Sequence, residues 1–318
     1  MAKTTEGHHD RSIMVQNQSP ATWSANNATR ERTMRIGGQM FFTDYSMSPV
    51  ELARALEERG FDSLWVPEHS HIPMSRKSPF PSGGDVPKKY YDVMDPFVVL
   101  GAAAAVTRTL LLGTGICLIA QRDPIQTAKQ VASIDQISGG RFLFGVGNGW
   151  NEDEMANHGT VFATRHKLAR ERIEAMKVIW TQSKAEYHGE FVNFDPMMTW
   201  PKPVQKPHPP ILVGGAFPYG ARRALSYGNG WMPHRTRKEY ADVQALLPKF
   251  REMAAEAGRD PASVPITIWG AKKENLDQLK RDRDDGVSRV VVGLDSAKAD
   301  TILPELDRWA TLIRQLGS

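Results

Sequence analysis

The sequence of 318 residues contains a single cysteine, Cys117. One cysteine cannot form a disulfide within the chain, which favours a reducing compartment such as the cytoplasm. Because Cys117 stands inside an apolar run, we expect a buried structural thiol rather than a nucleophile. The chain also lacks a dense run of Lys or Arg, and its formal net charge is only +4. We therefore expect no nucleic acid among its partners.

The sequence also lacks the marks of a membrane span and of a signal peptide. The longest apolar run, 97–120, carries Arg108 in its middle, and a charge at the centre of a span costs about 3 kcal/mol. An alanine-rich helix, a turn and a buried strand explain this run better. Residues 1–33 are polar and lack an apolar core of signal-peptide length. We interpret 1–33 as a flexible extension and 34–318 as one domain, and we expect no membrane partner.

The glycine-rich stretch GGRFLFGVGNGWNEDE, residues 139–154, lacks the spacing of a dinucleotide-binding fingerprint. Gly145, Gly147 and Gly149 alternate, and Trp150 occupies the position at which the fingerprint needs its last glycine. An indole there would keep the main chain away from a pyrophosphate. The stretch therefore predicts a strand that ends at the mouth of a barrel rather than a nucleotide cradle.

From Met34 onward the sequence alternates regularly between strand and helix patterns. The expected strands are 34–42, 62–69, 110–116, 141–147, 210–215, 230–233, 264–269 and 288–294. The expected helices are 48–60, 95–106, 123–137, 164–182, 217–227, 236–257, 272–285 and 299–314. Apolar strands that alternate with helices predict a parallel sheet covered on both faces. Eight such units predict an α/β fold of the (β/α)8 TIM-barrel type, with an open doubly wound sheet as the alternative.

The fifth strand is preceded by an insertion at 185–209, rich in Pro and aromatic residues, which predicts a hairpin and an extended segment. In a barrel of this type the chemistry lies where the strands end. Most of the predicted strand ends are glycine or other small residues, and few are acids or bases. Such ends suit a large flat ligand that the main chain approaches closely, rather than a cluster of metal ligands.

Five segments, in this order, resemble the luciferase-like barrel enzymes, and most closely their F-420-dependent oxidoreductase branch. The segments are SLWVPEH, LLLGTGI, DQISGGRFLFGVGNGWNEDE, PKPVQKPHPPILVGG and GNGWMPH. The resemblance covers about residues 34–316. It implies a barrel that binds coenzyme F-420 or FMN and acts on a small molecule, often as a homodimer. Of the two cofactors we favour F-420, which implies hydride transfer; FMN supplied by a separate reductase would imply monooxygenation.

The resemblance also implies site residues. His69, at the end of the second strand, matches a polar position near the redox edge of the ring, where an imidazole can steer a hydride acceptor or donate a proton. Its alternative is packing beneath the 70–94 loop. The third strand would back the ring with a cis peptide at Gly115–Ile116, which follow Thr114. Related sugar-phosphate dehydrogenases carry a glutamate at the position of Trp150, so its absence argues against sugar oxidation.

The remaining positions divide between cofactor and pocket. A helix that begins after glycines offers free N–H groups to a phosphate, which favours Gly214, Gly215 and Ala216, with Arg222 and Arg223 as phosphate ligands or as a solvated helix face. Expected beside the ring are Gly147, Asn148, Gly149, Arg165 and His166. Expected in the pocket, under the 70–94 loop and the insertion, are Trp150, Tyr90, Tyr91, Phe194 and Trp200. We interpret Glu152, Asp153 and Glu154 as the solvated first turn of a short helix.

Two functions of other classes stay open. His69-x-His71, with His234 and Asp295 at later strand ends, resembles part of the ligand set of metal-dependent amidohydrolase barrels, although the bridging ligand and the remaining histidines have no counterpart. A barrel that holds a flavin-like molecule without turnover is the other alternative.

Overall fold

The computed structural model describes residues 34–235, 242–271 and 275–317. The chain divides into two units, Met1–Glu31 and Arg32–Ser318, and every described residue belongs to the second. The predicted extension at 1–33 lies outside the described residues. So do the first residues of two predicted helices, 236–241 and 272–274.

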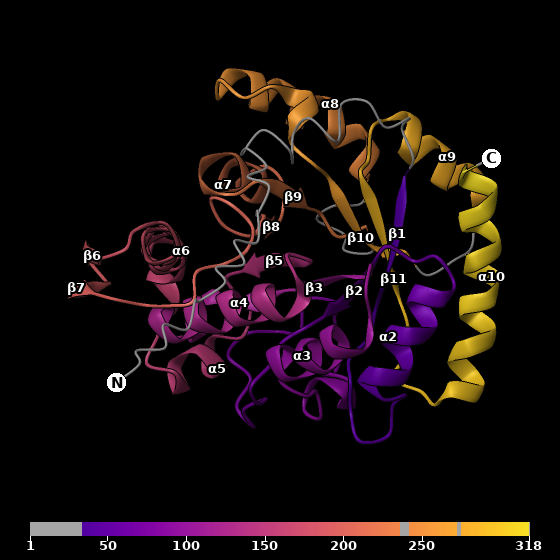
Figure 1. Ribbon diagram of the computed structural model, residues 1–318, viewed down its shortest axis with the longest axis horizontal. Helices are drawn as coiled ribbons and strands as arrows, with labels where there is room; N and C mark the ends of the chain where they lie inside the picture. Colours follow the sequence, from indigo (N-terminus) through magenta and orange to yellow (C-terminus); the bar gives the residue numbers. More distant parts are fainter. Residues whose placement is uncertain (1–33, 236–241, 272–274, 318) are drawn as a thin grey trace, which may run out of the picture. The chain divides into compact units, whose positions relative to one another are not determined.

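Eight parallel strands form the barrel (Figure 1). They are β1 (Arg35–Gln39), β2 (Ser63–Val66), β3 (Leu111–Thr114), β5 (Phe142–Gly147), β8 (Ile211–Gly214), β9 (Gly230–Met232), β10 (Thr267–Ala271) and β11 (Arg289–Gly293). Neighbours pair in the order β10, β11, β1, β2, β3, β5, β8, β9. Parallel bridges Trp231–Ile266 and His234–Trp269 join β9 to β10 and close the circle. The barrel prediction is therefore confirmed, and an open sheet is wrong.

Helices follow the strands and cover the outside of the barrel (Figure 1). They are α2 (Pro49–Glu58), α3 (Pro96–Val106), α4 (Pro124–Ser138), α5 (Glu152–Asn157), α6 (Arg165–Thr181), α7 (Tyr219–Tyr227), α8 (Val243–Glu256), α9 (Leu276–Asp284) and α10 (Ala299–Gly317). The start of α2 shows why the sequence signals worked. Ser48 and Glu51 cap each other's backbone N–H groups, and Pro49 opens the first turn, where a missing N–H costs nothing.

The interior of the barrel is filled by side chains rather than left as a channel. Trp65 of β2 and Trp269 of β10 meet edge to face, with ring centroids 5.6 Å apart. Glycine makes room for both indoles: a Cβ atom on Gly113 would lie 2.3 Å from the Trp65 ring, and one on Gly115 would lie 2.0 Å from the Trp269 ring. Larger residues at these two positions would collide with the packed interior.

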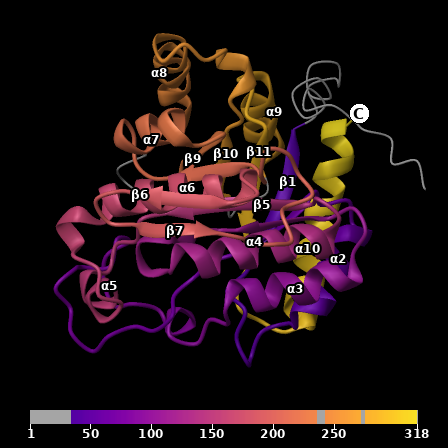
Figure 2. The same ribbon diagram turned by 60° about the vertical axis from the view of Figure 1, so that its left-hand side comes forward.

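The insertion at 185–209 forms the predicted hairpin, with β6 (Ala185–His188) antiparallel to β7 (Asn193–Met197). It lies on the outer side of α6, at the left edge of Figure 1 and in front of the barrel in Figure 2. Its later part crosses to the amino end of the strands, where Lys202 Nζ donates to the carbonyls of Ile179 and Gln182 at the end of α6. An insertion between a helix and the next strand leaves from that end of the barrel, and it therefore stays away from the carboxyl ends.

The apolar run 97–120 folds as α3, a turn, β3 and β4 (Cys117–Leu118), which pairs with β5. Cys117 is fully buried, as expected. Among the described helices, none is both long enough and apolar enough to cross a membrane.

Candidate functional site

The carboxyl ends of β2 and β5 bring two side chains together that lie 85 positions apart in the sequence. His69 follows β2, and Glu154 lies in the first turn of α5, which follows β5. His69 Nδ1 lies 2.8 Å from Glu154 Oε2, and the two side chains are 6% and 0% exposed. The backbone N–H of Ser70 donates to the other carboxylate oxygen at 3.1 Å. A buried carboxylate thus fixes the imidazole through the nitrogen nearer the main chain.

The charge of Glu154 determines which nitrogen of His69 is available. Burial alone would raise the pKa of Glu154, but the interactions with His69, together with hydrogen bonds from Gln121 and the Ser70 N–H, hold that pKa below its usual value. An ionised carboxylate only accepts hydrogen bonds, so Nδ1 of His69 carries the hydrogen. Nε2 is left as the nitrogen that can exchange a proton with a ligand.

The prediction that Glu152, Asp153 and Glu154 form a solvated first turn is wrong for two of the three. They do begin α5, but Asp153 is 7% exposed and Glu154 is fully buried. The reason is that the 70–94 loop packs on this helix: the N–H of Lys77 donates to Asp153 Oδ2 at 2.9 Å. Backbone donors from the loop stabilise both buried carboxylates. The sequence shows three acids at a helix start, a pattern that does not reveal such a tertiary partner.

Aromatic rings surround His69. Its ring centroid lies 5.3 Å from that of Tyr90 and 5.9 Å from that of Trp150, both predicted pocket residues. Phe80 completes the group, 5.2 Å from Tyr90 and 5.6 Å from Trp150. We call His69, Phe80, Tyr90 and Trp150 the aromatic cluster. Phe80 was not predicted, because the 70–94 loop has no periodicity from which the direction of a side chain follows.

The structure does not bring the other three predicted pocket residues to the aromatic cluster. Tyr91 is 44% exposed, and its hydroxyl donates to the carbonyl of Val86 within its own loop. Phe194 packs on Tyr187 of the hairpin, with centroids 6.2 Å apart. Trp200 is 59% exposed, and its carbonyl accepts from Lys129 on α4. The expectation that the insertion covers the pocket is corrected, because the insertion runs along the outer helices.

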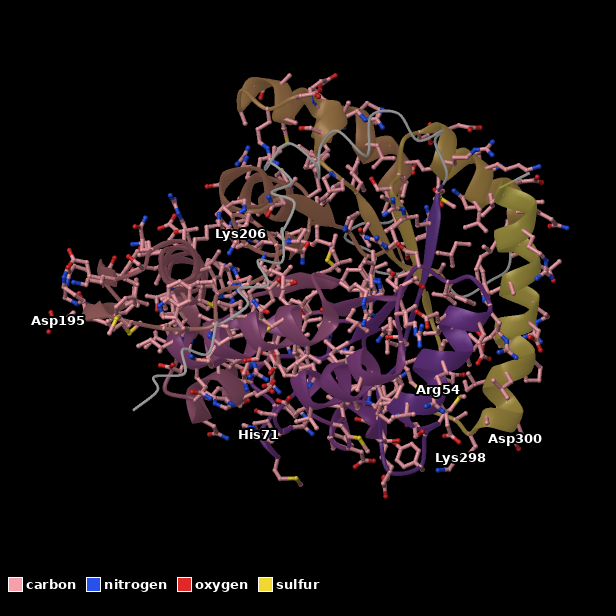
Figure 3. The ribbon with its side chains drawn as sticks, viewed as in Figure 1. Arg54, His71, Asp195, Lys206, Lys298 and Asp300 are labelled. Atoms are coloured by element: carbon pink, nitrogen blue, oxygen red, sulfur yellow. The ribbon has the colours of Figure 1, made fainter. Side chains whose placement is uncertain are left out.

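Figure 3 separates these two regions directly. Asp195 of β7 lies at the left edge of the molecule, whereas His71, two residues after His69, lies at the bottom. The hairpin and the loop that follows β2 therefore lie in different parts of the molecule.

The backbone at the end of β3 is as expected, but the glycines there and at the end of β5 contact protein side chains. The Gly115–Ile116 peptide is cis, as the resemblance implied. Thr114 Oγ1 donates to the carbonyl of Gly145 at 2.7 Å and so ties β3 to β5. A Cβ atom on Gly147 would lie 1.9 Å from Ile116 Cδ1. At Gly115 and Gly147, the absent side chain thus admits a neighbouring protein side chain, whereas the sequence suggested contact with a ligand.

A basic site lies at the junction of β8 and α7. Gly215 has a φ of 136°, which favours glycine, and a Cβ atom there would lie 2.9 Å from Arg223 Nη2. The Nε atoms of Arg223 and Arg165 are buried and have no hydrogen-bond partner in the described part of the chain. A buried unpaired donor costs about 1–3 kcal/mol. A bound phosphate would supply the missing acceptors.

The residues around this junction show its positive potential. Desolvation, together with the charges of Arg165 and Arg223, lowers the pKa of His166 to about 4. A neutral His166 accepts at Nδ1 from Asn148 Nδ2 at 2.6 Å, which links the end of β5 to α6. Arg222, in contrast, is exposed, with its guanidinium 5.9 Å from the centroid of the Tyr219 ring. Of the two adjacent arginines, Arg223 is the one at the junction.

Two other features lie apart from this site. Within the described ranges, no group of three or more His, Cys, Asp or Glu side chains is arranged to hold a metal ion; His71 contacts Ser70 and Asn157 instead. A cavity of about 500 Å³ lies between the starts of α2 and α10, lined by Thr43, Met47, Met94 and Lys298 among others. It contains none of the predicted site residues.

Comparison with known proteins identifies the family. The model described as luciferase-like monooxygenase matches residues 42–271. An uncharacterized protein of Mycobacterium tuberculosis is 39% identical over 285 residues, which is 87% of this chain and 98% of that one. The chain therefore belongs to the luciferase-like monooxygenase family.

Relatives with named activities use two different cofactors. The FMNH(2)-dependent dimethylsulfone monooxygenase of Pseudomonas putida is 32% identical over 180 residues, 56% of this chain and 46% of that one. The F420-dependent hydroxymycolic acid dehydrogenase of Mycobacterium tuberculosis is 27% identical over 218 residues, 68% of this chain and 56% of that one.

Solved structures have the same fold at low identity. The monooxygenase RslO1 of Streptomyces bottropensis has a TM-score of 0.71 at 21% identity, covering 90% of this chain and 100% of that one. An F420-dependent secondary alcohol dehydrogenase has a TM-score of 0.69 at 21% identity, covering 89% of this chain and 99% of that one.

Proposed function

We propose that this member of the luciferase-like monooxygenase family is an oxidoreductase that transfers a hydride between coenzyme F-420 and a small organic substrate. The observation that carries the proposal is the His69–Glu154 pair at the carboxyl end of the barrel, on the same rim as two half-buried arginines, Arg165 and Arg223. Their buried Nε atoms have no hydrogen-bond partner among the described residues. The pair can move a proton, and the arginines can hold a phosphate. When bound, F-420 supplies a two-electron carrier that gives or takes a hydride.

The basic site has the donors that a phosphorylated cofactor needs. We assign the phosphate to Arg165, Arg223 and the main chain of Gly214, Gly215 and Ala216, which precede the nine-residue helix α7. We assign the ring to the main chain at the ends of β3 and β5, near Thr114, Gly115, Ile116, Gly147, Asn148 and Gly149. Arginine suits this role because its planar fork pairs with phosphate oxygens.

The chemistry of the chain itself is proton transfer. In alcohol oxidation, Nε2 of His69 takes the hydroxyl proton as the carbon loses its hydride; in carbonyl reduction, it returns that proton to the oxygen. Glu154 keeps the imidazole oriented and stabilises its positive charge while it holds the extra proton. The 70–94 loop, tied to α5 through Lys77, excludes water from the pair.

FMN-dependent monooxygenation with a separate reductase is the second candidate, favoured by the similarity to the dimethylsulfone monooxygenase. F-420 and FMN share a tricyclic ring and a phosphate, so the basic site fits both. Three further proposals are one barrel domain at 34–318, from the strand–helix alternation, a cytoplasmic location, from the single cysteine, and a homodimer, from the family resemblance.

Calorimetric titration of the purified protein with F-420 and with FMN tests the proposal. We expect F-420 to bind more tightly than FMN, and Arg223→Ala to weaken binding about 10- to 100-fold, as the loss of a charged hydrogen bond of about 1.5–3 kcal/mol requires. The control is Arg222→Ala, which removes an exposed neighbouring charge and should leave affinity nearly unchanged. Tighter binding of FMN would reverse the cofactor preference. Binding of neither would contradict the proposed function.

A further inference from the structure

The aromatic cluster encloses His69. The imidazole side chain is 6% exposed, and the rings of Tyr90 and Trp150 lie on it, with centroids 5.3 and 5.9 Å away. Phe80 packs edge to face on the same two rings, 5.2 Å from Tyr90 and 5.6 Å from Trp150. Rings at these separations are in contact, so the cluster is packed on itself. A molecule of substrate size therefore reaches His69 only after part of the cluster has moved.

Phe80 belongs to the least attached part of the loop that follows β2. The residues before it, Lys77 and Ser78, are tied to the first turn of α5 by hydrogen bonds of 2.9 and 3.1 Å. After it, Val86 is buried and begins the next attached part of the loop. Among the described residues, no hydrogen bond or ion pair joins 79–85 to the rest of the chain. We call 79–85 the loop tip.

The loop tip has a shape of its own. Residues 80–83 form a β-turn, in which the N–H of Gly83 donates to the carbonyl of Phe80 at 2.8 Å. Proline in the second position and glycine in the fourth, as in this turn, favour that geometry. The residues from Ser82 to Asp85 are exposed. The tip can therefore swing as one unit, and Phe80 is the ring that it carries into the aromatic cluster.

We propose that the loop tip is a gate over His69 and that Phe80 holds this gate shut. Withdrawal of Phe80 removes one of the two contacts that hold Tyr90 and Trp150 together, the other being with His69 itself. Contacts between ring edges and faces are weak, so the tip can open while the barrel stays folded. The inference rests on the proposed function in one respect, namely that the substrate must reach His69. Closure then keeps water away from the His69–Glu154 pair during the reaction.

The test measures how fast diethyl pyrocarbonate, which acylates an unprotonated imidazole nitrogen, modifies His69 in the full-length protein. Tandem mass spectrometry of peptides follows each histidine separately. We expect His69 to react at about one-tenth of the rate of the exposed His188, or more slowly. Phe80→Ala should speed the reaction at His69 about tenfold, because it loses two ring contacts. Phe80→Tyr, which keeps the ring, should leave the reaction slow.

The matched control is Met74→Ala, which removes a 93% exposed side chain from the same loop and should leave the rate at His69 unchanged. His208, half-buried against Trp180, is the internal reference and should react at one rate in every variant. Equal rates at His69 and His188 in the unaltered protein would overturn the inference. An unchanged rate at His69 in Phe80→Ala would also overturn it, as would a matching rise at His208, which would indicate general unfolding.

Should Phe80→Ala not fold, Phe80→Leu decides, because it removes the ring and keeps most of the apolar volume. It should speed the reaction at His69 about threefold, and an unchanged rate would overturn the inference. These rates need no cofactor. If neither F-420 nor FMN binds, the proposed function fails and the rates still test the gate. If a cofactor binds and the rate at His69 does not depend on Phe80, the inference fails alone.

Discussion

The two ends of the barrel differ in how completely their buried charged groups are paired. At the amino end, the guanidinium of Arg289 forms a forked pair with Asp62, at 2.7–3.0 Å. Ser63 Oγ donates to the same carboxylate and in turn accepts from Trp65 Nε1 of the interior. The uncharged hydroxyl of Thr267, at the start of β10, is buried there without a described partner. Each charged group named here, however, is fully paired.

At the carboxyl end, some charged groups are paired, as Glu68 is with Arg122, but others are left with open positions. Arg165 and Arg223 have buried Nε atoms without described partners, and His69 is fixed on one nitrogen only. Buried charged donors without partners destabilise the unliganded protein. Their presence at the carboxyl end of the barrel therefore points to ligand binding there. We infer that the paired charges at the amino end stabilise the fold, while the incompletely paired charges at the carboxyl end are available to bind a ligand.

The largest expected effect breaks the carboxyl end. His69→Ala should lower kcat about 100- to 10,000-fold, the range of a lost general acid–base group. It should also lower the free energy of unfolding, because it leaves the buried Glu154 carboxylate without its imidazole partner. Steady-state kinetics with the cofactor that binds, together with chemical denaturation, measure both quantities. The control is His208→Ala. This histidine packs on Trp180, with ring centroids 5.6 Å apart, and it precedes β8 at the amino end of the barrel. Unchanged turnover in His69→Ala would remove this residue from the mechanism.

The next effect breaks the amino end. Asp62→Asn leaves the Arg289 side chain, 8% exposed, without its counter-charge. The loss of one partner of a buried pair costs about 3–5 kcal/mol of stability. Urea denaturation measures this loss, and kcat should be unchanged at temperatures where the variant is folded. Asp284→Asn, which removes a 66% exposed partner of Arg283, should cost almost nothing. A large fall in kcat without loss of stability would contradict the division between the two ends.

A smaller effect sharpens the comparison through pH. Glu57 accepts from the N–H groups of Arg108, Thr109 and Leu110 at the amino end of β3; burial opposes these bonds, yet they lower its pKa from 4.5 to about 2. A carboxyl whose folded pKa is depressed stabilises the protein above pH 4.5, and this contribution is lost as the pH falls toward 2.

The measurement is the free energy of unfolding between pH 6 and pH 2.5. Glu57→Gln should remove about 1–3 kcal/mol of the acid-dependent loss. The control is Glu58→Gln, at the exposed neighbouring residue, which should leave the pH dependence of the free energy of unfolding unchanged. An identical slope in Glu57→Gln would show that the hydrogen bonds of Glu57 do not contribute to the loss of stability in acid.

The smallest effect concerns Cys117. Burial raises the pKa of this thiol well above its usual value, and the side chain is 0% exposed. The thiolate is the reactive form, so the folded protein should resist an aromatic disulfide reagent that labels it fully in urea. Rapid labelling of the folded protein would show that β4 opens.

The fold was accessible from the sequence because its signals are local. Ser48-Pro49-Val50-Glu51 encodes a helix start within four residues, and each apolar strand is a short continuous run. His69 was accessible as well, because in a barrel its position after a strand sets its place in space. Glu154 and Phe80 were not accessible, since their roles depend on the packing of the 70–94 loop against α5.

Phe194 and Trp200 show the opposite error. Their aromatic, proline-rich surroundings resemble a lid, yet their segment connects a helix to the following strand. Topology therefore places their segment along the outer helices. The Tyr187 hydroxyl, on which Phe194 packs, donates to Glu174 of α6, and the Trp200 carbonyl accepts from Lys129 of α4. The glycines at 115 and 147 could not be interpreted fully for another reason, because room for the Trp269 and Ile116 side chains and room for a ligand look the same in a sequence.

The most direct test of the division between the two ends is a crystal structure of the F-420 complex. The account predicts the cofactor phosphate within hydrogen-bond distance of Arg165 and Arg223, at the junction before α7, with the ring beside the end of β3 and His69 Nε2 facing it. A phosphate bound elsewhere, for example in the cavity beside Lys298, with both arginine Nε atoms still unpaired, would contradict it.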